Sequence, residues 1–257
     1  MNNFTIGADP EIFVGDETSV RSIVGKIGGT KEHPLGLPLG EGFAVQEDNV
    51  ALEFNIPPSK SKAEFVRNIC TATQFLEQTM IDRHNLHFVK RAAASFPLEE
   101  LMTPEALVFG CDPDYNAWTK RRNPRPHVDD PSLRSCGGHV HIGLDGLDPI
   151  TVVKGCDLFL AIPSLFMDKD EQRRLLYGKA GAHRIKPFGV EYRTLSNFWV
   201  FEPKYIEWVH DNVSRALDAV SNNFDFDSEQ ENIVNAINNN DRAIADMLIQ
   251  KYQLQVV

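Results

Sequence analysis

KPFGVEYRTLSNFW, residues 186–199, is the stretch that decides how the rest of the chain is interpreted. Its alternating pattern predicts a strand that directs Val190 and Tyr192 towards a core. Glu191 and Arg193 then project together from the opposite face, so a carboxylate and a guanidinium share one surface. A single pair of this kind is typical of an exposed ion pair, which contributes little to stability. The same pattern recurs in other strands, and this recurrence favours a functional role.

Three further predicted strands carry polar side chains at alternate positions. Two of them have a plain structural explanation, because Asp-Pro-Glu is typical of a turn and two histidines separated by one residue occur in strands by chance. Together they predict a sheet with one polar, acidic face opposite an apolar face. The polar pairs are Asp9 and Glu11 in GADPEIF, Glu53 and Asn55 in DNVALEFNIPP, and His139 and His141 in GGHVHIG.

An acidic face of this kind predicts a metal site. Burying several carboxylates is costly unless cations neutralise them. Oxygen-rich ligands with a single histidine favour Mg²⁺ or Mn²⁺ over a structural zinc, and these ions commonly hold nucleotide phosphates. The basic residues near the final strand could neutralise a transferring phosphoryl group, although residues of this type also complete helix C-termini. They are Arg173, Arg174, Lys179, Arg184 and Arg193.

The composition predicts a soluble cytoplasmic protein. The chain has 257 residues, of which 42% are hydrophobic, enough for the core of one large domain or two small ones. Its net charge of −10 has the wrong sign for a protein that coats nucleic acid. The chain starts without the features of a signal peptide, and its apolar runs are short. The four cysteines lack a CxxC motif, which indicates neither a zinc knuckle nor a disulfide framework.

Apolar residues at helical spacing predict helices outside these strands. The first should be capped by Ser59 or Ser61, and the second should be kinked or ended near Pro163. A short strand is expected from Ala106 to Gly110. The predicted helices extend from the serine cap to about residue 83, over 151–167, beyond Pro203, and over 229–238 and 241–252.

Two irregular segments are candidates for recognising substrates. Residues 25–42 are rich in glycine and proline, and residues 120–127 form a dense basic run broken by prolines. Each has a simpler alternative, a floppy hairpin end for the first segment and a solvated surface patch for the second. The basic run is the first place to expect an anionic ligand.

Five blocks of sequence, in order, resemble one known family. GADPEIF, DNVALEFNIPP, GGHVHIG, RRLLYGKAGAHR and GVEYRTLSNFW are similar to the phage-type carboxylate-amine ligases, or amidoligase type 2 proteins, of the glutamine synthetase and glutamate-cysteine ligase superfamily. The blocks span most of residues 5–199, and the tail from about residue 203 lies outside them. The resemblance implies one α+β domain over residues 1–257, with a curved, mainly antiparallel sheet and helices on its outer face, like the glutamine synthetase catalytic domain. An ATP–Mg²⁺ site is expected in the concave face.

The resemblance also implies roles for individual residues. Asp9 stands where the family usually has glutamate, so its shorter side chain is a departure from the pattern. Arg193 should contact the transferred phosphate and, with Arg184 and Glu53, act in catalysis, while His141 faces nucleotide or substrate. The expected metal ligands are Asp9, Glu11, Glu53, His139 and Glu191. The expected nucleotide contacts are Arg173, Arg174, Lys179, Arg184, Arg193 and His141.

The function that follows is an ATP-dependent ligase that joins a carboxylate to an amine through an acyl phosphate. Its substrates should be small molecules or peptides, and neither nucleic acid nor membrane is expected as a partner. One alternative is a metal-dependent hydrolase that uses His139 and His141 as ligands. Another is a catalytically inactive nucleotide-binding module, which the short acid at Asp9 would favour. Simple phosphoryl transfer to a small acceptor is a variant of the ligase chemistry.

Overall fold

The computed structural model describes residues 4–107, 114–124 and 129–257. Its sheets are antiparallel, and the first is built around the strand that carries Glu191. Because residues on neighbouring strands lie side by side, His141 is placed directly opposite Glu191, and Arg184 lies opposite Glu191 on the other side. The strand order is β1 (Thr5–Ala8), β11 (Val140–Gly143), β13 (Gly189–Tyr192), β12 (Ala182–Lys186) and β9 (Tyr115–Asn116).

The second sheet carries the predicted acids Glu11 and Glu53, while Asp9 lies between β1 and the first residue of this sheet. Glu11 pairs with Glu53, and Glu53 pairs with Gln46 on its other side. β8 (Ala93–Ser95) and β10 (Leu133–Ser135) pair in a separate two-stranded sheet. The order is β3 (Val20–Arg21), β2 (Glu11–Gly15), β6 (Ala51–Asn55), β5 (Ala44–Asp48) and β4 (Leu35–Gly36), and β7 (His87–Val89) also pairs with β2.

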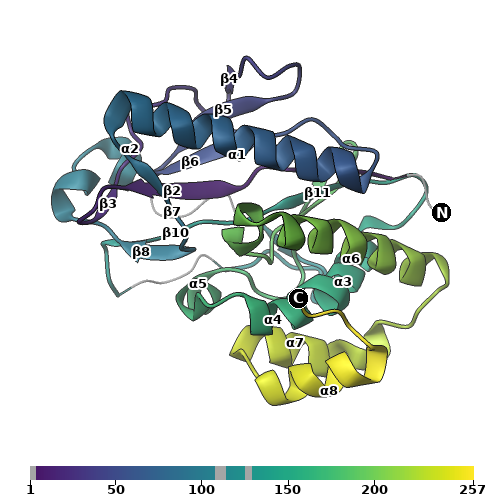
Figure 1. Cartoon of the computed structure of the whole chain (residues 1–257). Helices are drawn as coiled ribbons and strands as arrows, with labels where there is room; N and C mark the ends of the chain where they lie inside the picture. The colour runs from purple at the N-terminus through teal and green to yellow at the C-terminus, as the bar shows by residue number, and fades with distance from the viewer. Residues whose placement is uncertain (1–3, 108–113, 125–128) are drawn as a thin grey trace.

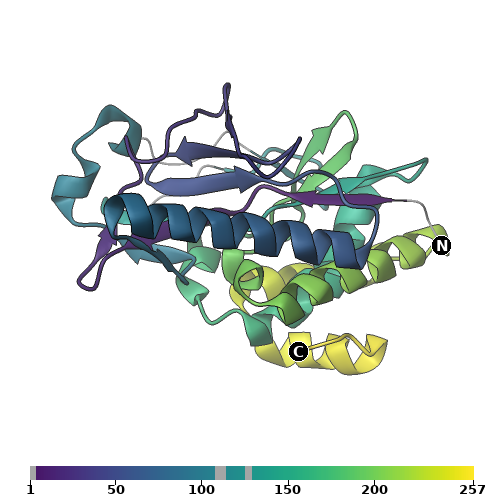
Figure 2. The ribbon, with the colours of Figure 1, turned by 45° about the horizontal axis from the view of Figure 1, so that its top comes forward.

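The two larger sheets form one strongly curled surface, because the chain after β6 continues along β1. The backbone N–H of Phe54 donates to Pro10 O at 3.2 Å, and that of Ile56 donates to Ala8 O at 3.3 Å. Figure 2 shows the sheets on one side of the molecule and the helices gathered on the other. The expected curved antiparallel sheet of an α+β fold is thus confirmed.

The inner helices are α1 (Lys62–His84), α3 (Pro149–Cys156) and α6 (Pro203–Ser221), which pack against one another through α6 (Figure 1). The hydroxyl of Ser61 accepts a hydrogen bond from the Glu64 N–H, as expected for an N-cap. Asn85 ends α1 in the left-handed conformation, with φ of 54°. Both boundaries of this helix were therefore predictable from local chemistry.

The helical stretch around Pro163 contains the expected irregularity. Residues Asp157–Ala161 form a π-helical turn between α3 and α4 (Ile162–Met167), with the Ile162 N–H donating to Asp157 O. Proline has no N–H to donate to the preceding turn, so a wider turn accommodates it. Within the described ranges, Pro149–Met167 is also the one helix long and apolar enough to cross a membrane, but most of it is buried inside the protein, as is typical of a core helix.

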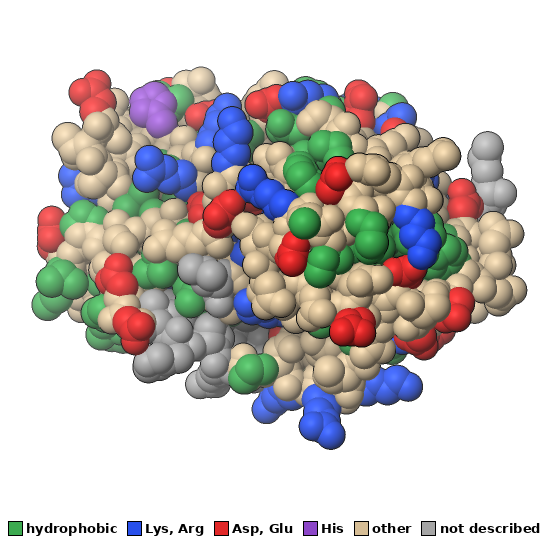
Figure 3. Space-filling view, turned by 90° about the horizontal axis from the view of Figure 1, so that it is seen from below, with side chains coloured by type: hydrophobic (Ala, Val, Ile, Leu, Met, Phe, Trp, Pro, Cys, Tyr) green, Lys and Arg blue, Asp and Glu red, His purple; other side chains and the backbone are tan. Residues whose placement is uncertain are grey.

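The C-terminal helices form an outer layer. α7 (Gln230–Asn239) and α8 (Arg242–Tyr252) pack against α4, on the side away from the sheet (Figure 1). Seen from below, acidic and basic side chains are interspersed over the surface (Figure 3). The remaining helical elements are α5 (Glu171–Leu176), α2 (Pro104–Leu107) and short turns at Leu98–Leu101, Asn197–Phe201 and Asp227–Glu229, named η1, η3 and η4.

One predicted strand is wrong where the structure describes it. Ala106 and Leu107 belong to helix α2, and residues 108–113 lie outside the described residues. A short apolar run does not distinguish a strand from a buried helical turn, because both bury the same residue types. The end of the basic run, from residue 125, also lies outside the described residues.

Candidate active site

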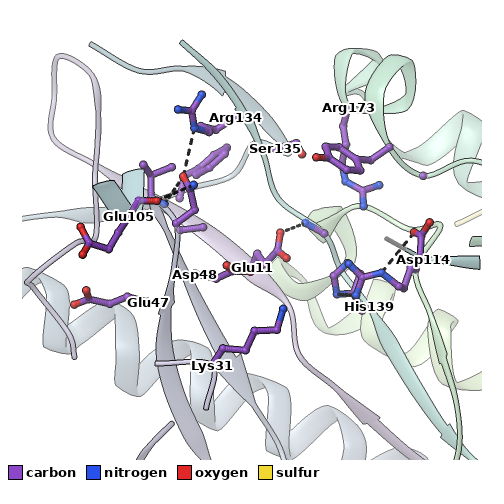
Figure 4. Close-up of a pocket in the computed structure, with 18 of the residues that line it drawn as sticks. Glu11, Lys31, Glu47, Asp48, Glu105, Asp114, Arg134, Ser135, His139 and Arg173 are labelled. Carbon is purple, nitrogen blue, oxygen red and sulfur yellow. Dashed lines mark hydrogen bonds and ion pairs between the residues drawn. The ribbon is translucent and has the colours of Figure 1, made fainter. Parts of the chain in front are cut away.

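A polar groove with two connected lobes lies on the sheet. The larger lobe is a cavity of about 450 Å³, and the smaller is about 290 Å³. Both are lined by Glu11, Lys31, Asp48, His139 and Arg193, so these five residues mark the junction. Figure 4 shows Glu11, Asp48 and Lys31 near the centre of the larger lobe, with His139, Asp114 and Arg173 on one side and Glu47, Glu105 and Arg134 on the other.

A first ligand cluster consists of Asp9, His141 and Glu191, whose ligand atoms lie within 4.8 Å of one another. Asp9 Oδ2 is 3.2 Å from His141 Nε2, and Asp9 Oδ1 is 3.4 Å from His139 Nδ1. Burial opposes ionisation of Asp9, but the two histidines outweigh it and hold the pKa of that carboxyl well below its usual range. The short side chain of Asp9 therefore reaches the histidines and is ionised.

A second ligand cluster consists of Glu11, Asp48 and Glu53, again within 4.8 Å. Glu11 Oε2 accepts a 2.6 Å hydrogen bond from the Gly137 N–H. Burial raises the pKa of Glu11, and burial together with Asp9, Glu11 and Asp48 raises the pKa of Glu53 well above its usual value. Glu11 and Glu53, whose ionisation is opposed, form with Asp48 a suitable oxygen ligand set for a divalent cation, because the charge of the cation favours the ionised carboxylates.

Glu191 is fully buried and surrounded by cations. It forms an ion pair with Arg193, and its oxygens lie 2.7 Å from Lys186 Nζ and 3.7 Å from Arg184 Nη1. Burial and the nearby Asp9 oppose ionisation, but Arg193, His139 and Lys186 lower the pKa of Glu191 to about 2. The pair that looked like a surface salt bridge in isolation is a buried charge centre.

Arg193 joins the two lobes of the groove. Its Nη1 lies 3.3 Å from His139 Nδ1, and its Nε lies 3.6 Å from Asp114 Oδ2. The guanidinium is about 6% exposed, so an anion entering from either lobe meets a largely desolvated charge. Electrostatic contacts of this type are stronger than exposed ones because little water screens them.

The glycine pair before His139 lets the final strand approach. Gly138 donates to Leu195 O at 3.0 Å, and Trp199 Nε1 donates to Gly138 O at 3.1 Å. A Cβ atom on Gly138 would overlap the backbone oxygen of Ser196. Only glycine therefore permits this contact, which holds His139 beside Arg193.

The opposite face of the Glu191 strand is anchored to the buried Asp157. Asp157 Oδ1 accepts from the hydroxyls of Tyr192 at 2.8 Å and Thr194 at 3.4 Å. Its Oδ2 accepts from Trp118 Nε1 at 2.7 Å and the Gly181 N–H at 2.6 Å. Because residues alternate between faces, holding Tyr192 and Thr194 from behind directs their neighbours into the groove.

The predicted basic contacts divide into two groups. Arg184 and Arg193 line the smaller lobe, and Arg173 lines the larger lobe, where its Nη1 also donates to Thr194 O at 3.2 Å. Arg174 instead points into the protein, where its Nη2 lies 3.2 Å from Asp168 Oδ2. Lys179 donates to Asn238 O at 3.3 Å, at the end of α7. Neither Arg174 nor Lys179 lines a lobe of the groove.

The structure brings in residues that the sequence interpretation missed. Asp48 completes the second ligand cluster, and Lys186 is the nearest ammonium group to Glu191. Asp48 could have been found, because it alternates with Gln46 in the strand that precedes Glu53. Lys31, at the junction, belongs to the glycine-rich segment, which Glu47 anchors by accepting hydrogen bonds from the backbone of residues 25–28.

Comparison with protein families supports the sequence resemblance. Residues 132–229, less than half of the chain, match the family described as phage phiEco32-like COOH.NH2 ligase-type 2. This segment contains His139, His141, Arg184, Glu191 and Arg193, but not the acids of the second sheet. The match confirms the resemblance to the amidoligase family, whose name indicates a carboxylate-amine ligase. A search of curated proteins finds no match.

Proposed function

We propose that the protein is an ATP- and Mg²⁺-dependent ligase that forms an amide from a carboxylate and an amine through an acyl phosphate. The observation that carries the proposal is the junction of the two lobes, where Arg193 stands between two acidic ligand clusters. In this proposal the nucleotide phosphates would occupy one lobe, and the organic substrates would occupy the other. The family match over residues 132–229 supports the same chemistry.

The acidic clusters fit a divalent cation. Asp9, His141 and Glu191 would hold one ion, and Glu11, Asp48 and Glu53 a second, since hard cations prefer carboxylate oxygens and the ligand atoms of each set lie within 4.8 Å of one another. Asp9 Oδ1 is buried and accepts no hydrogen bond from the described residues, as expected for an atom that has a further ligand. Bound Mg²⁺ would supply charge neutralisation for the phosphates of ATP.

The chain's own residues would position the reactants and stabilise charge. The substrate carboxylate attacks the γ-phosphorus of ATP, the bond to ADP breaks, and the amine then attacks the acyl carbon and displaces phosphate, losing a proton. Arg193 and Arg184 would face the charge that spreads over the transferring phosphoryl group. His139 would keep the Arg193 guanidinium in place from its other side, 3.3 Å away.

Two features favour this reaction over the alternatives. A metal-dependent hydrolase needs a bound water but has no use for the three cations, Arg184, Lys186 and Arg193, that surround Glu191. An inactive module was suggested by the short acid at position 9, yet Asp9 lies within reach of both histidines. The geometry therefore supports an active phosphoryl-transfer site.

An isotope experiment tests the proposal. Mixtures of acids and amines are screened for ADP release and amide formation, and the productive acid is then labelled with ¹⁸O in its carboxylate. We expect one ¹⁸O atom in the phosphate product, because the carboxylate oxygen that attacks phosphorus leaves with it. Amide cleavage without ATP would support the hydrolase instead, and amide formation without label in phosphate would exclude the acyl phosphate.

Removing the second acidic cluster should weaken cation binding. We expect the double variant Asp48→Asn/Glu53→Gln to bind Mg²⁺ at least about tenfold more weakly than the wild type, because two of three oxygen ligands lose their charge. Calorimetric titration with Mg²⁺ alone measures the change. Glu41→Gln, at an exposed acid of the glycine-rich segment, is the matched control and should bind as the wild type does. Equal affinity in the double variant would remove this cluster from the proposal.

A further inference from the structure

A second cavity lies outside the active-site groove. It has a volume of about 510 Å³, within the range of small-molecule sites. Its walls come from three segments: residues 90–93 before β8, residues 167–172 between α4 and α5, and residues 197–205 of η3 and the start of α6. It shares no lining residue with the two lobes of the groove.

The rim of this cavity carries three exposed cations, Lys90, Arg91 and Lys169. In the part of the chain that the structure describes, none of them takes part in an ion pair. The protein has a net charge of −10, so cations without acidic partners are notable at one opening. Because charge is screened over about 8–10 Å in physiological salt, these local groups decide which ligand approaches.

The acids of the cavity are already engaged. Asp170 Oδ2 accepts from the backbone N–H groups of Ala92 at 2.8 Å and Ala93 at 2.7 Å. Asp168 Oδ2 lies 3.2 Å from Arg174 Nη2, and Glu202 Oε2 lies 3.6 Å from Lys204 Nζ. These acids therefore leave the rim cations available for an anion from solution.

Aromatic side chains supply the second part of the site. Phe198 and Tyr205 meet edge to face, with ring centroids 5.7 Å apart, and both line the cavity. Phe201 also lines it, with Lys90 Nζ 5.9 Å from the ring centroid. All three rings are only partly buried, so a flat apolar group has surface to cover.

From this combination we infer that the cavity is a binding site for a small aromatic anion, a molecule in which a planar ring carries a phosphate or carboxylate group. The ring would pack on Phe198, Phe201 and Tyr205. The anionic group would face Lys90, Arg91 and Lys169. Neither the cations nor the rings would suffice alone. Exposed cations bind anions weakly, and an uncharged aromatic molecule would make no ion pair with the cations.

The cavity also adjoins the active-site groove through one side chain. Asn197 lines the cavity, and its amide donates to Glu11 O at 2.8 Å and to Arg91 O at 3.3 Å. Glu11 belongs to the second ligand cluster of the groove, and Arg91 to the rim of the cavity. An occupant of the cavity would therefore contact Asn197, whose amide also holds the backbone of β2 at Glu11.

The test measures binding of two probes, phenyl phosphate and inorganic phosphate, by calorimetry. We expect the wild type to bind phenyl phosphate at least about tenfold more tightly than inorganic phosphate, since only the former uses the rings. The triple variant Lys90→Ala/Arg91→Ala/Lys169→Ala should lose at least about tenfold in affinity for phenyl phosphate. Phe201→Leu should reduce the preference for phenyl phosphate while retaining inorganic phosphate binding.

Controls separate this cavity from the groove and from general charge. Lys60→Ala/Arg67→Ala, two exposed cations near and on α1, should bind phenyl phosphate as the wild type does. Arg193→Ala should also retain binding, because Arg193 lies in the groove. The inference is overturned if phenyl phosphate binding is lost in Arg193→Ala but unchanged in the triple variant. It is equally overturned if the folded wild type binds neither probe more tightly than the triple variant does.

Discussion

Replacing Arg193 with alanine should reduce ATP-dependent amide formation by about 10³-fold or more while leaving the protein folded. The expected loss is of the size found when an arginine that faces a transferring phosphoryl group is removed. The fold should survive because Glu191 keeps Lys186 at 2.7 Å and Arg184 at 3.7 Å as cationic neighbours. We therefore expect the free energy of unfolding to fall by less than the roughly 3–5 kcal/mol that exposing an unpaired buried charge costs.

Arg193→Lys and Arg67→Ala are the informative companions to this variant. Lysine retains the charge but not the planar fork, so its rate should fall between those of the wild type and the alanine variant. Arg67 is an exposed cation on α1, and its removal should leave the rate unchanged. ADP release and amide formation give the rates, and denaturant unfolding reports stability. ATP turnover by Arg193→Ala at the wild-type rate would contradict the assigned role.

Replacing Asp157 with alanine should lower the free energy of unfolding by about 4 kcal/mol or more. The substitution leaves Trp118 Nε1, the Gly181 N–H and the Tyr192 hydroxyl without their shared acceptor in a fully buried site. Each buried polar group without a partner costs about 1–3 kcal/mol. Denaturant unfolding monitored by circular dichroism measures the loss.

The variant Asp157→Asn should lose much less unfolding free energy than Asp157→Ala. It should also remove one source of the pH dependence of stability. Its amide oxygen can accept from Trp118 and Gly181, while its NH₂ donates to the Tyr192 hydroxyl, which acts as an acceptor. Burial outweighs the hydrogen bonds that Asp157 accepts and raises its pKa to about 7. A raised folded-state pKa contributes stability that is present below about pH 4 and is lost as the pH rises towards 7.

The difference in unfolding free energy between the wild type and Asp157→Asn should therefore shift against the wild type between pH 4 and 7. The size of the shift is on the order of 4 kcal/mol, from the difference between the raised pKa of about 7 and the ordinary aspartate value. Comparing the two proteins at each pH cancels the titration of other groups, such as Asp9 and Glu191, whose pKa values move in the opposite direction. A constant difference across this range would show that Asp157 stays ionised.

Local sequence chemistry predicted most of the elements that frame the site. The serine cap of α1, the irregularity before Pro163 and the long helix after Pro203 agree with the structure. Alternation also identified the strands that carry Glu11, Glu53, His141 and Glu191. The strand expected at Ala106 was wrong because it depended on a short apolar run without a period of its own.

The set of groove residues was predicted less completely. Arg174 was expected beside the phosphates, but one residue further along a helix turns a side chain by about 100°, and Arg174 packs against Asp168 while Arg173 lines the groove. Lys179 contacts the end of α7, an element from the distant tail of the chain. The sequence did not predict that Asp157 anchors the Glu191 strand, because a single aspartate in an apolar helix forms no pattern that identifies its partners.

The amino-acid sequence by itself determined which side chains share a face, because the period of a strand is two and that of a helix is 3.6. It thus determined that Glu191 and Arg193 project from the same side of their strand. Only the tertiary structure decided which faces meet. Pairing between strands distant in the sequence set His141 opposite Glu191, and brought Glu11 to Glu53 and Asp48. The physical reason is that hydrogen bonds between strands, and the packing of helices behind them, fix the register, and neither is encoded within any one segment.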